Sequence, residues 1–169
     1  MHDSSTYRGE PRATPPQAPQ SYPFPKATDG LLPWAHPLER LERARNYWLA
    51  TTRPDGRSHV TPLWGVWVDG SLYFDGLPTT RWARNLAANP AASVHLESGD
   101  DVVILEGTVD DIVTDADLGA RIVGAWDAKY GRLHPKPDTQ GIFRFRPRTA
   151  RAWSSASLVD GTRWTFAAE

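Results

Sequence analysis

Residues 57–75 read RSHVTPLWGVWVDGSLYFD, and this stretch decides the fold. Two runs rich in Val, Trp, Tyr and Phe flank the pair Asp69-Gly70. An Asp-Gly pair between such runs is typical of a two-residue β-hairpin, because both residues tolerate the positive φ that its turn requires. We therefore expect one long strand over residues 57–68, a tight turn, and a second strand over residues 71–75.

Strand patterns recur along the rest of the chain and are mostly separated by short turns. They predict further strands over residues 46–53, 92–97, 102–113, 141–146, 149–154 and 162–166. The spacing of apolar residues predicts helices over residues 37–46, 79–89 and 115–130. Most connections are too short for the crossovers of a parallel sheet. The sequence thus indicates a mainly β (α+β) fold: a closed or nearly closed antiparallel barrel of about six to eight strands with two or three peripheral helices.

The composition excludes several classes of protein. The chain of 169 residues balances 19 Lys and Arg against 20 Asp and Glu, so no basic field favours binding to nucleic acid. It has no cysteine, which excludes disulfides, thiolate metal sites and cysteine nucleophiles. We find no signal-peptide pattern and only short apolar runs, so we expect a cytoplasmic protein that does not interact with membranes.

Prolines are concentrated near the N-terminus. Eight of the 15 prolines precede residue 38, among polar residues with little aliphatic content. Such a segment cannot bury enough apolar surface to offset the entropy lost on ordering it. We predict an extended Pro-rich arm over residues 1–30 that is dispensable for folding, and a single folded domain over residues 31–169.

The sequence Thr79-Thr80-Arg81, at the start of the helix predicted over residues 79–89, is the most informative candidate site. Hydroxyl groups, free backbone N–H groups and an arginine at a helix start suit a phosphate. Upstream, Pro62 withdraws one donor from strand pairing and leaves neighbouring backbone groups available to a flat polar ring. A planar heterocycle with a phosphate tail would fit between this strand and this helix.

The sequence His95-Leu96-Glu97 resembles half of a zinc deaminase signature, but the thiolate half is absent because the chain has no cysteine. We therefore expect no metal site, and we expect His95 and Glu97 on the polar face of a strand.

Several motifs together resemble one known family. They are YWLATTRPDGRSHVTPLW at residues 47–64, TRWARNLAANP at 80–90, VHLESG at 94–99, LEGT at 105–108, ARAW at 150–153 and TRWTF at 162–166. Over residues 35–167 the chain is similar to the pyridoxamine 5′-phosphate oxidase-like split β-barrel family. Within it, the chain is most similar to the flavin/deazaflavin oxidoreductase branch, which often uses coenzyme F420. The resemblance implies a homodimer with the cofactor sites at the subunit interface.

The same resemblance implies which residues hold the cofactor. They are Val60, Thr61, Pro62, Trp64, Thr79, Thr80, Arg81, Trp82, Asn85 and Trp153. The family's phosphate-binding element reads Ser-Arg-Lys-Ala, and Thr80 and Arg81 take its first two places. Trp82 stands where lysine is usual, which removes one cation from the pocket. This favours coenzyme F420 over FMN, because the F420 phosphodiester carries less charge than the FMN phosphate.

The resemblance further implies an oxidoreductase that transfers a hydride from reduced coenzyme F420 to a small conjugated acceptor of enone, quinone or tetrapyrrole type. The cofactor performs the redox step, while the protein orients it in a dry pocket. No residue stands out as an obligatory acid or base; Lys129, Tyr130 and His59 are candidates to deliver a proton, and solvent is the alternative. Two other interpretations stay open: an FMN-dependent oxidase or reductase of the same family, and a non-catalytic protein that binds flavin or haem.

Overall fold

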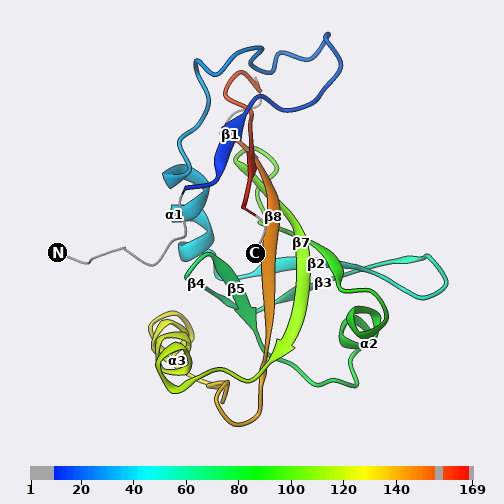
Figure 1. Cartoon of the computed structure of the whole chain (residues 1–169), viewed down its shortest axis with the longest axis vertical. Helices are drawn as coiled ribbons and strands as arrows, with labels where there is room; N and C mark the ends of the chain where they lie inside the picture. The colour runs from blue at the N-terminus through cyan, green and yellow to red at the C-terminus, as the bar shows by residue number, and fades with distance from the viewer. Residues whose placement is uncertain (1–9, 155–157, 168–169) are drawn as a thin grey trace.

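The computed structural model describes residues 10–154 and 158–167, which form an antiparallel sheet with three helices around it (Figure 1). The strands are β1 (Arg12–Thr14), β2 (Tyr47–Thr52), β3 (Ser58–Leu63), β4 (Val66–Val68), β5 (Ser71–Phe74), β6 (Ala91–His95), β7 (Val102–Ile112), β8 (Ile142–Trp153) and β9 (Thr162–Thr165). The helices are α1 (Ala35–Arg43), α2 (Arg81–Ala88) and α3 (Ala116–Tyr130). The mainly β split barrel and all three predicted helices are thereby confirmed. No helix in these residues is long and apolar enough to cross a bilayer.

Strand β8 organises the sheet, because it pairs with three other strands. The strand order runs β1-β9-β8-β7-β6-β2-β3, and β5 pairs with both β8 and β4. β7 covers one edge of β8 over its whole length. On the other edge, the first half of β8 pairs with β5 and the second half pairs with β9. Two branches of the sheet therefore start from β8, one leading to β4 and one to β1.

The strand predicted over residues 57–68 is in fact two strands, separated at Trp64 and Gly65. β3 pairs with β2, whereas β4 pairs with β5 on the other branch. A side chain at position 65 would place its Cβ 2.8 Å from the carbonyl oxygen of Tyr73, so the close approach of the two chain segments requires glycine here. β3 and β4 are therefore consecutive in the chain but are not paired with each other. This gap in the ladder of hydrogen bonds splits the barrel.

The hairpin predicted at Asp69-Gly70 is confirmed. Val68 pairs with Ser71, and φ is 48° at Asp69 and 78° at Gly70. Positive φ at both central residues gives the tight turn that matches the twist of antiparallel strands.

The two strands predicted over residues 141–146 and 149–154 are one strand, β8. The sequence pattern breaks at Pro147, because proline cannot donate a ladder hydrogen bond. The structure accommodates Pro147 at a β-bulge, where it lies opposite Gly107 and the pairing register shifts. A side chain at position 107 would place its Cβ 2.0 Å from the carbonyl oxygen of Arg146, so glycine permits the bulge.

Apolar side chains fill two compartments on opposite faces of the β4–β5 hairpin. Leu72 and Phe74 face the barrel interior. Val66 and Tyr73 face the other way and pack against α3, whose Ile122 is fully buried there. Successive strand residues point to opposite faces. All residues of β5 are buried, so the barrel covers one face of this strand and α3 covers the other.

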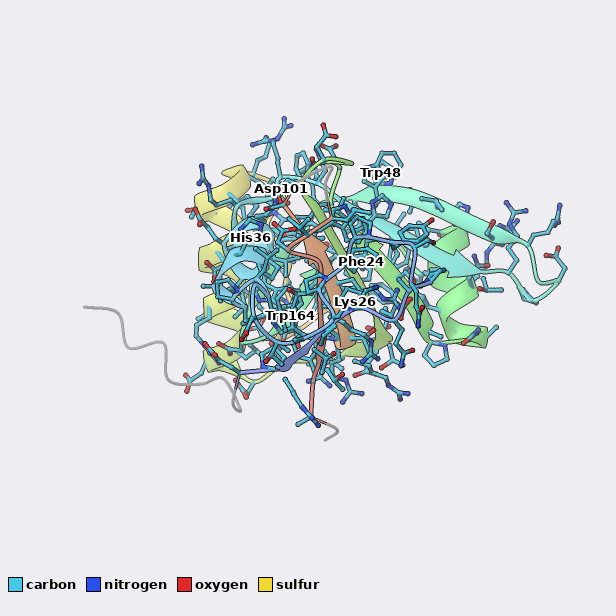
Figure 2. The ribbon with its side chains drawn as sticks, turned by 90° about the horizontal axis from the view of Figure 1, so that it is seen from above. Phe24, Lys26, His36, Trp48, Asp101 and Trp164 are labelled. Atoms are coloured by element: carbon cyan, nitrogen blue, oxygen red, sulfur yellow. The ribbon has the colours of Figure 1, made fainter. Side chains whose placement is uncertain are left out.

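Part of the predicted arm lies on the barrel. Arg12–Thr14 forms β1, antiparallel to β9, a three-residue strand that the sequence pattern did not reveal. Phe24 packs at Gly161, where an added Cβ would lie 2.2 Å from the Phe24 ring. Viewed from above, the arm with Phe24 and Lys26 passes over the end of the barrel (Figure 2). The first nine residues of the predicted arm lie outside the described residues.

Deletion of residues 1–30 is expected to leave the barrel folded and to lower its melting temperature. The deletion removes the β1 ladder and uncovers Gly161, but every buried residue of the interior cluster lies at position 34 or later. Circular dichroism and thermal melts of the full and shortened chains measure the effect. Phe24→Ala is the control that separates loss of the Phe24 contact from loss of β1. A shortened chain that does not fold would show that the arm belongs to the folded domain.

Candidate functional site

The start of α2 has the features of an anion-binding element. Thr80 caps the helix, since its side-chain oxygen accepts a hydrogen bond from the Ala83 N–H at 3.3 Å. Thr79 and Arg81, on either side of it, are exposed. The first N–H groups of a helix carry partial positive charge and lack acceptors within the helix, so this end attracts anions. The structure brings these three predicted residues together.

A buried amide holds α2 on the sheet. Asn85 is fully buried, and its Nδ2 donates a hydrogen bond to Thr51 Oγ1 at 3.0 Å. Thr51 belongs to β2, and its hydroxyl lies 3.5 Å from the carbonyl oxygen of His59 on β3. Asn85 Oδ1 has no hydrogen-bond partner among the described residues. The Asn85 side chain thus fixes the start of α2 relative to β2 and β3.

Trp82 points into the barrel interior. Its indole is 8% exposed and meets the rings of Phe74 and Phe143 edge-on, with centroids 5.4 and 4.8 Å away. Gly76 gives it room, because an added Cβ there would lie 2.5 Å from the indole. Trp82, which the resemblance includes among the cofactor residues, is thus part of the core. In this position it adds neither charge nor surface to the exposed helix start.

Strand β3 presents a free edge, because its only partner in the described sheet is β2. Alternate backbone N–H and C=O groups on such an edge are available to a ligand. Val60 and Pro62 lie on one face and are exposed, with Val60 at 50%. Thr61 lies on the opposite face and is half-buried. α2 packs against both β2 and β3.

Trp64 lies just beyond β3, in a cluster of rings and cations. Its indole stacks on Tyr130, with ring centroids 4.5 Å apart and an interplanar angle of 8°. The guanidinium carbons of Arg132 and Arg45 lie 5.2 and 5.9 Å from the Trp64 ring centroid. Stacking and cation–π attraction hold Trp64 in place. The sequence analysis missed both arginines, because they lie in connecting segments with no motif around them.

Lys129 and Tyr130, two of the three candidates for proton delivery, are engaged at the break between β3 and β4. Lys129 Nζ donates hydrogen bonds to Tyr47 Oη at 3.0 Å and to the Gly65 carbonyl oxygen at 3.3 Å. Burial lowers the pKa of Lys129 to about 8. Burial also raises the pKa of Tyr47 and that of Tyr130. These tyrosines are therefore neutral near pH 7, and the lysine is charged at a site that disfavours its charge.

Trp153 and His59 are two further predicted residues. Trp153 ends β8, which β7, β6 and β2 separate from β3 in the sheet order. Phe24 of the arm packs edge-on against it at 6.1 Å. Along the sheet order, three strands stand between Trp153 and the free edge of β3. His59, the third candidate for proton delivery, is half-buried on β3 opposite Thr51.

The turn between β2 and β3 adds charges that the sequence analysis did not single out. Asp55 accepts hydrogen bonds from Arg57 Nε and Nη2 at 3.0 and 2.7 Å. These bonds hold the pKa of Asp55 below its usual value, and the charges of Arg53 and Arg81 lower it further. Arg53 and Arg81 are thus within electrostatic reach of one carboxylate. Arg53, Asp55 and Arg57 lie in the sequence RPDGR at residues 53–57, at the turn between two predicted strands.

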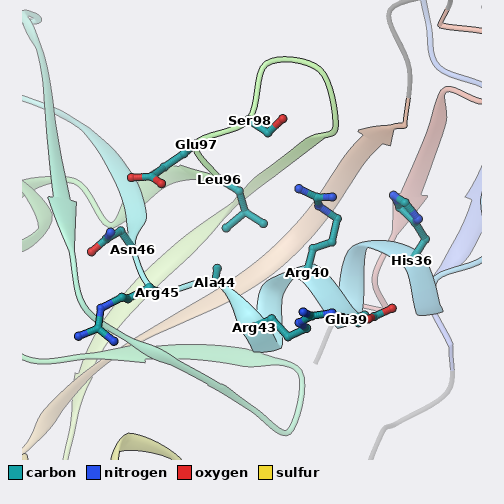
Figure 3. A pocket seen from close by; sticks show the side chains of 10 residues that line it. All are labelled: His36, Glu39, Arg40, Arg43, Ala44, Arg45, Asn46, Leu96, Glu97 and Ser98. Carbon is teal, nitrogen blue, oxygen red and sulfur yellow. Dashed lines mark hydrogen bonds and ion pairs between the residues drawn. The ribbon is translucent and has the colours of Figure 1, made fainter. Parts of the chain in front are cut away.

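Two hollows in the chain lie away from the predicted cofactor residues. The larger, of about 610 Å³, lies between α1, the segment leading to β2 and the turn after β6 (Figure 3). Its wall is largely neutralised, because Arg40 and His36 both pair with Asp101 and Arg43 pairs with Glu39. The second, of about 530 Å³, lies among β2, the first residue of β3, β6, β7 and β8. Neither hollow is lined by any of the ten predicted residues.

His95 lies on β6 and takes part in local packing. Its ring stacks on Trp48 with centroids 6.2 Å apart, and its Nδ1 lies 2.8 Å from the carbonyl oxygen of Leu96. Over the part of the chain that the structure describes, no group of three His, Asp or Glu side chains could hold a metal ion.

The sequence from residue 36 to residue 154 matches the family described as Pyridoxamine 5'-phosphate oxidase. This range runs from α1 to just beyond the end of β8 and contains the barrel strands β2 to β8. The chain therefore belongs to this family. No curated protein matches the chain.

Several solved structures have a similar fold. A conserved hypothetical protein from Mycobacterium tuberculosis is 24% identical, with a TM-score of 0.63 over 79% of this chain and 92% of that one. An F420 reductase is 31% identical, with a TM-score of 0.53 over 66% of this chain and 93% of that one. An FAD-binding protein from Mesorhizobium loti is 20% identical, with a TM-score of 0.56 over 80% of this chain and 96% of that one.

The free energy of unfolding is expected to rise relative to that of the Lys129→Met variant as the pH increases from about 7 to about 10. Burial lowers the pKa of Lys129 to about 8 in the folded chain, below its ordinary value of 10.5. Between these values the unfolded chain binds more protons than the folded chain, so raising the pH favours folding. Urea denaturation at several pH values measures the difference. Parallel pH profiles for the two proteins would contradict the burial of a charged lysine.

Proposed function

We propose that the chain is an oxidoreductase that uses coenzyme F420 to transfer a hydride to a small conjugated acceptor. The observation that carries the proposal is that α2, which begins at Thr80 and Arg81, packs against β3, a strand with a free edge. Membership of the pyridoxamine 5′-phosphate oxidase family supports a flavin-type cofactor, and the 31% identity to an F420 reductase supports the deazaflavin.

The residues at this place suit both ends of such a cofactor. The exposed guanidinium of Arg81 and the N–H groups at the start of α2 suit a phosphate. The free backbone groups of β3 suit the polar edge of a flat ring, and the exposed side chain of Val60 suits its apolar face.

The bound cofactor would supply the hydride chemistry. The chain's own residues hold the cofactor at two points: Thr80 and Arg81 bind its phosphate, and the β3 edge orients its ring. Val60 and Trp64 exclude water from the ring. We assign proton delivery to solvent, because the polar atoms of Lys129 and Tyr130 are engaged at the strand break.

The choice of coenzyme F420 over FMN follows from the position of Trp82. Its indole is packed in the interior, so position 82 supplies no cation to a phosphate at the helix start. The FMN phosphate is a dianion, whereas the F420 phosphodiester carries one charge. Coulomb attraction scales with the product of the charges, so the missing lysine weakens FMN binding more than F420 binding.

We further infer a homodimer with the cofactor at its interface. The β3 edge has no strand partner in the described sheet, and a second copy of the chain would enclose a ring bound there. Trp153 lies several strands away from β3 in its own chain, so it would contact the cofactor from the partner subunit.

Titration of the purified protein with coenzyme F420, FMN, FAD and haem tests the proposal, and coenzyme F420 is expected to bind most tightly. Arg81→Ala is expected to weaken its binding about ten- to a hundredfold, the effect of losing one charge-assisted hydrogen bond. Arg43→Ala is the control, because Arg43 is an exposed arginine on α1 rather than on α2. It is expected to bind as tightly as the unmodified chain.

Oxidation of reduced F420 that depends on an added enone or quinone would then establish the reaction. Tighter binding of FMN would replace the deazaflavin by the FMN-dependent alternative. Binding without any acceptor-dependent oxidation would identify a carrier of flavin or haem. Equal affinities for the unmodified chain and Arg81→Ala would remove the helix start from the site.

A further inference from the structure

Tyr130, the last residue of α3, links three segments of the chain through one hydroxyl. Its side chain is buried. The Tyr130 oxygen lies 2.9 Å from both the nitrogen and the carbonyl oxygen of Gly65, and 2.8 Å from the carbonyl oxygen of Arg45. A hydroxyl has one hydrogen to donate, so it accepts from the Gly65 N–H and donates to one of the two carbonyls. One atom thus ties α3 to the strand break and to the segment before β2.

Gly65 needs this contact because it stands between two strands. It is buried and belongs to neither β3 nor β4, and a buried N–H group requires an acceptor. Lys129 also donates to the Gly65 carbonyl oxygen, at 3.3 Å, so that oxygen has a second donor. Loss of the Tyr130 hydroxyl would therefore remove the acceptor of the Gly65 N–H, whereas the Gly65 carbonyl oxygen would keep Lys129 as a donor.

The ring of Tyr130 holds the side chain next to that glycine. It stacks on Trp64 at 4.5 Å with the planes 8° apart. Trp64 directly follows Leu63, the last residue of β3. The Tyr130 hydroxyl thus bonds to the backbone of Gly65, and the Tyr130 ring packs on the side chain of the preceding residue, Trp64.

We propose that Tyr130 is a positioning residue for the cofactor ring, because it fixes where β3 ends and how Trp64 is oriented. The inference rests on the proposed function, in which the β3 edge and Trp64 surround that ring. The helix start is held by a different contact, between Asn85 and Thr51. The effect of Tyr130 is therefore expected at the ring end of the cofactor and not at its phosphate end.

The test compares ligands with and without a phosphate in the Tyr130→Phe variant, which keeps the aromatic ring and loses the hydroxyl. Binding of FMN and of riboflavin is expected to weaken by the same factor, about tenfold for one buried hydrogen bond. The same equal loss is expected for coenzyme F420 and for its chromophore without the phosphodiester. Arg81→Ala, in contrast, should weaken only the phosphate-bearing member of each pair.

Tyr73→Phe is the matched control. Tyr73 is a buried tyrosine of β5 that packs in the same cluster against α3; its backbone approaches Gly65, but its hydroxyl bonds to Ser71 and Arg144. This variant is expected to bind all four ligands as the unmodified chain does. A general loss of stability would weaken binding in both tyrosine variants. A positioning role is identified if only Tyr130→Phe weakens binding and the loss of affinity is equal for the two ligands of each pair.

Amide hydrogen exchange gives a readout that needs no ligand. The Gly65 N–H is expected to exchange slowly in the unmodified chain and faster in Tyr130→Phe. Fast exchange of Gly65 in the unmodified chain would overturn the inference even if the variant does not fold. Faster exchange with unchanged affinities would also overturn it, because Tyr130 would then have only a structural role. An unmodified chain that binds none of the four ligands would overturn the proposed function, and the role of Tyr130 toward a cofactor with it.

Discussion

The break between β3 and β4 is the constraint on which the rest of the structure depends. At Trp64 and Gly65 the chain leaves the ladder with β2 and enters the ladder with β5, so the barrel is joined there by covalent continuity alone. Buried peptide groups at such a point need partners from outside the sheet. Tyr130 and Lys129 supply them from the end of α3. Lys129 also bonds to Tyr47, whose hydroxyl donates to a carbonyl of α1, so one place joins the barrel to two helices.

The same break leaves β3 with one partner and a free edge, beside which Asn85 anchors α2 through Thr51. A strand with a surface suited to a flat ring and a helix with an end suited to an anion thus pack against one another. Packing also limits the charge at that end. Trp82 fills the barrel interior between Phe74 and Phe143, so position 82 is used for the core and supplies no cation.

Features that depend on neighbouring residues could be predicted from the sequence. The Asp69-Gly70 turn and the capped start of α2 are local, and both are confirmed. The differences arise from contacts between distant segments: Gly107 opposite Pro147 merges two predicted strands, and β9 gives a partner to three residues of the arm. In the candidate site, the sequence Thr79-Thr80-Arg81 predicted the residues at the start of α2. The contact of Tyr130 with Gly65 depends on how α3 packs on the sheet, which no local pattern encodes.

The central claim is that the free edge of β3 and the start of α2 form one cofactor site. Amide hydrogen exchange of the chain with and without saturating coenzyme F420 tests it most directly, because the method reports where the ligand lies. The account predicts slower exchange on binding in residues 60–64 and 79–81 together. Protection confined to the hollow between α1 and the turn after β6, or protection in neither segment, would contradict it.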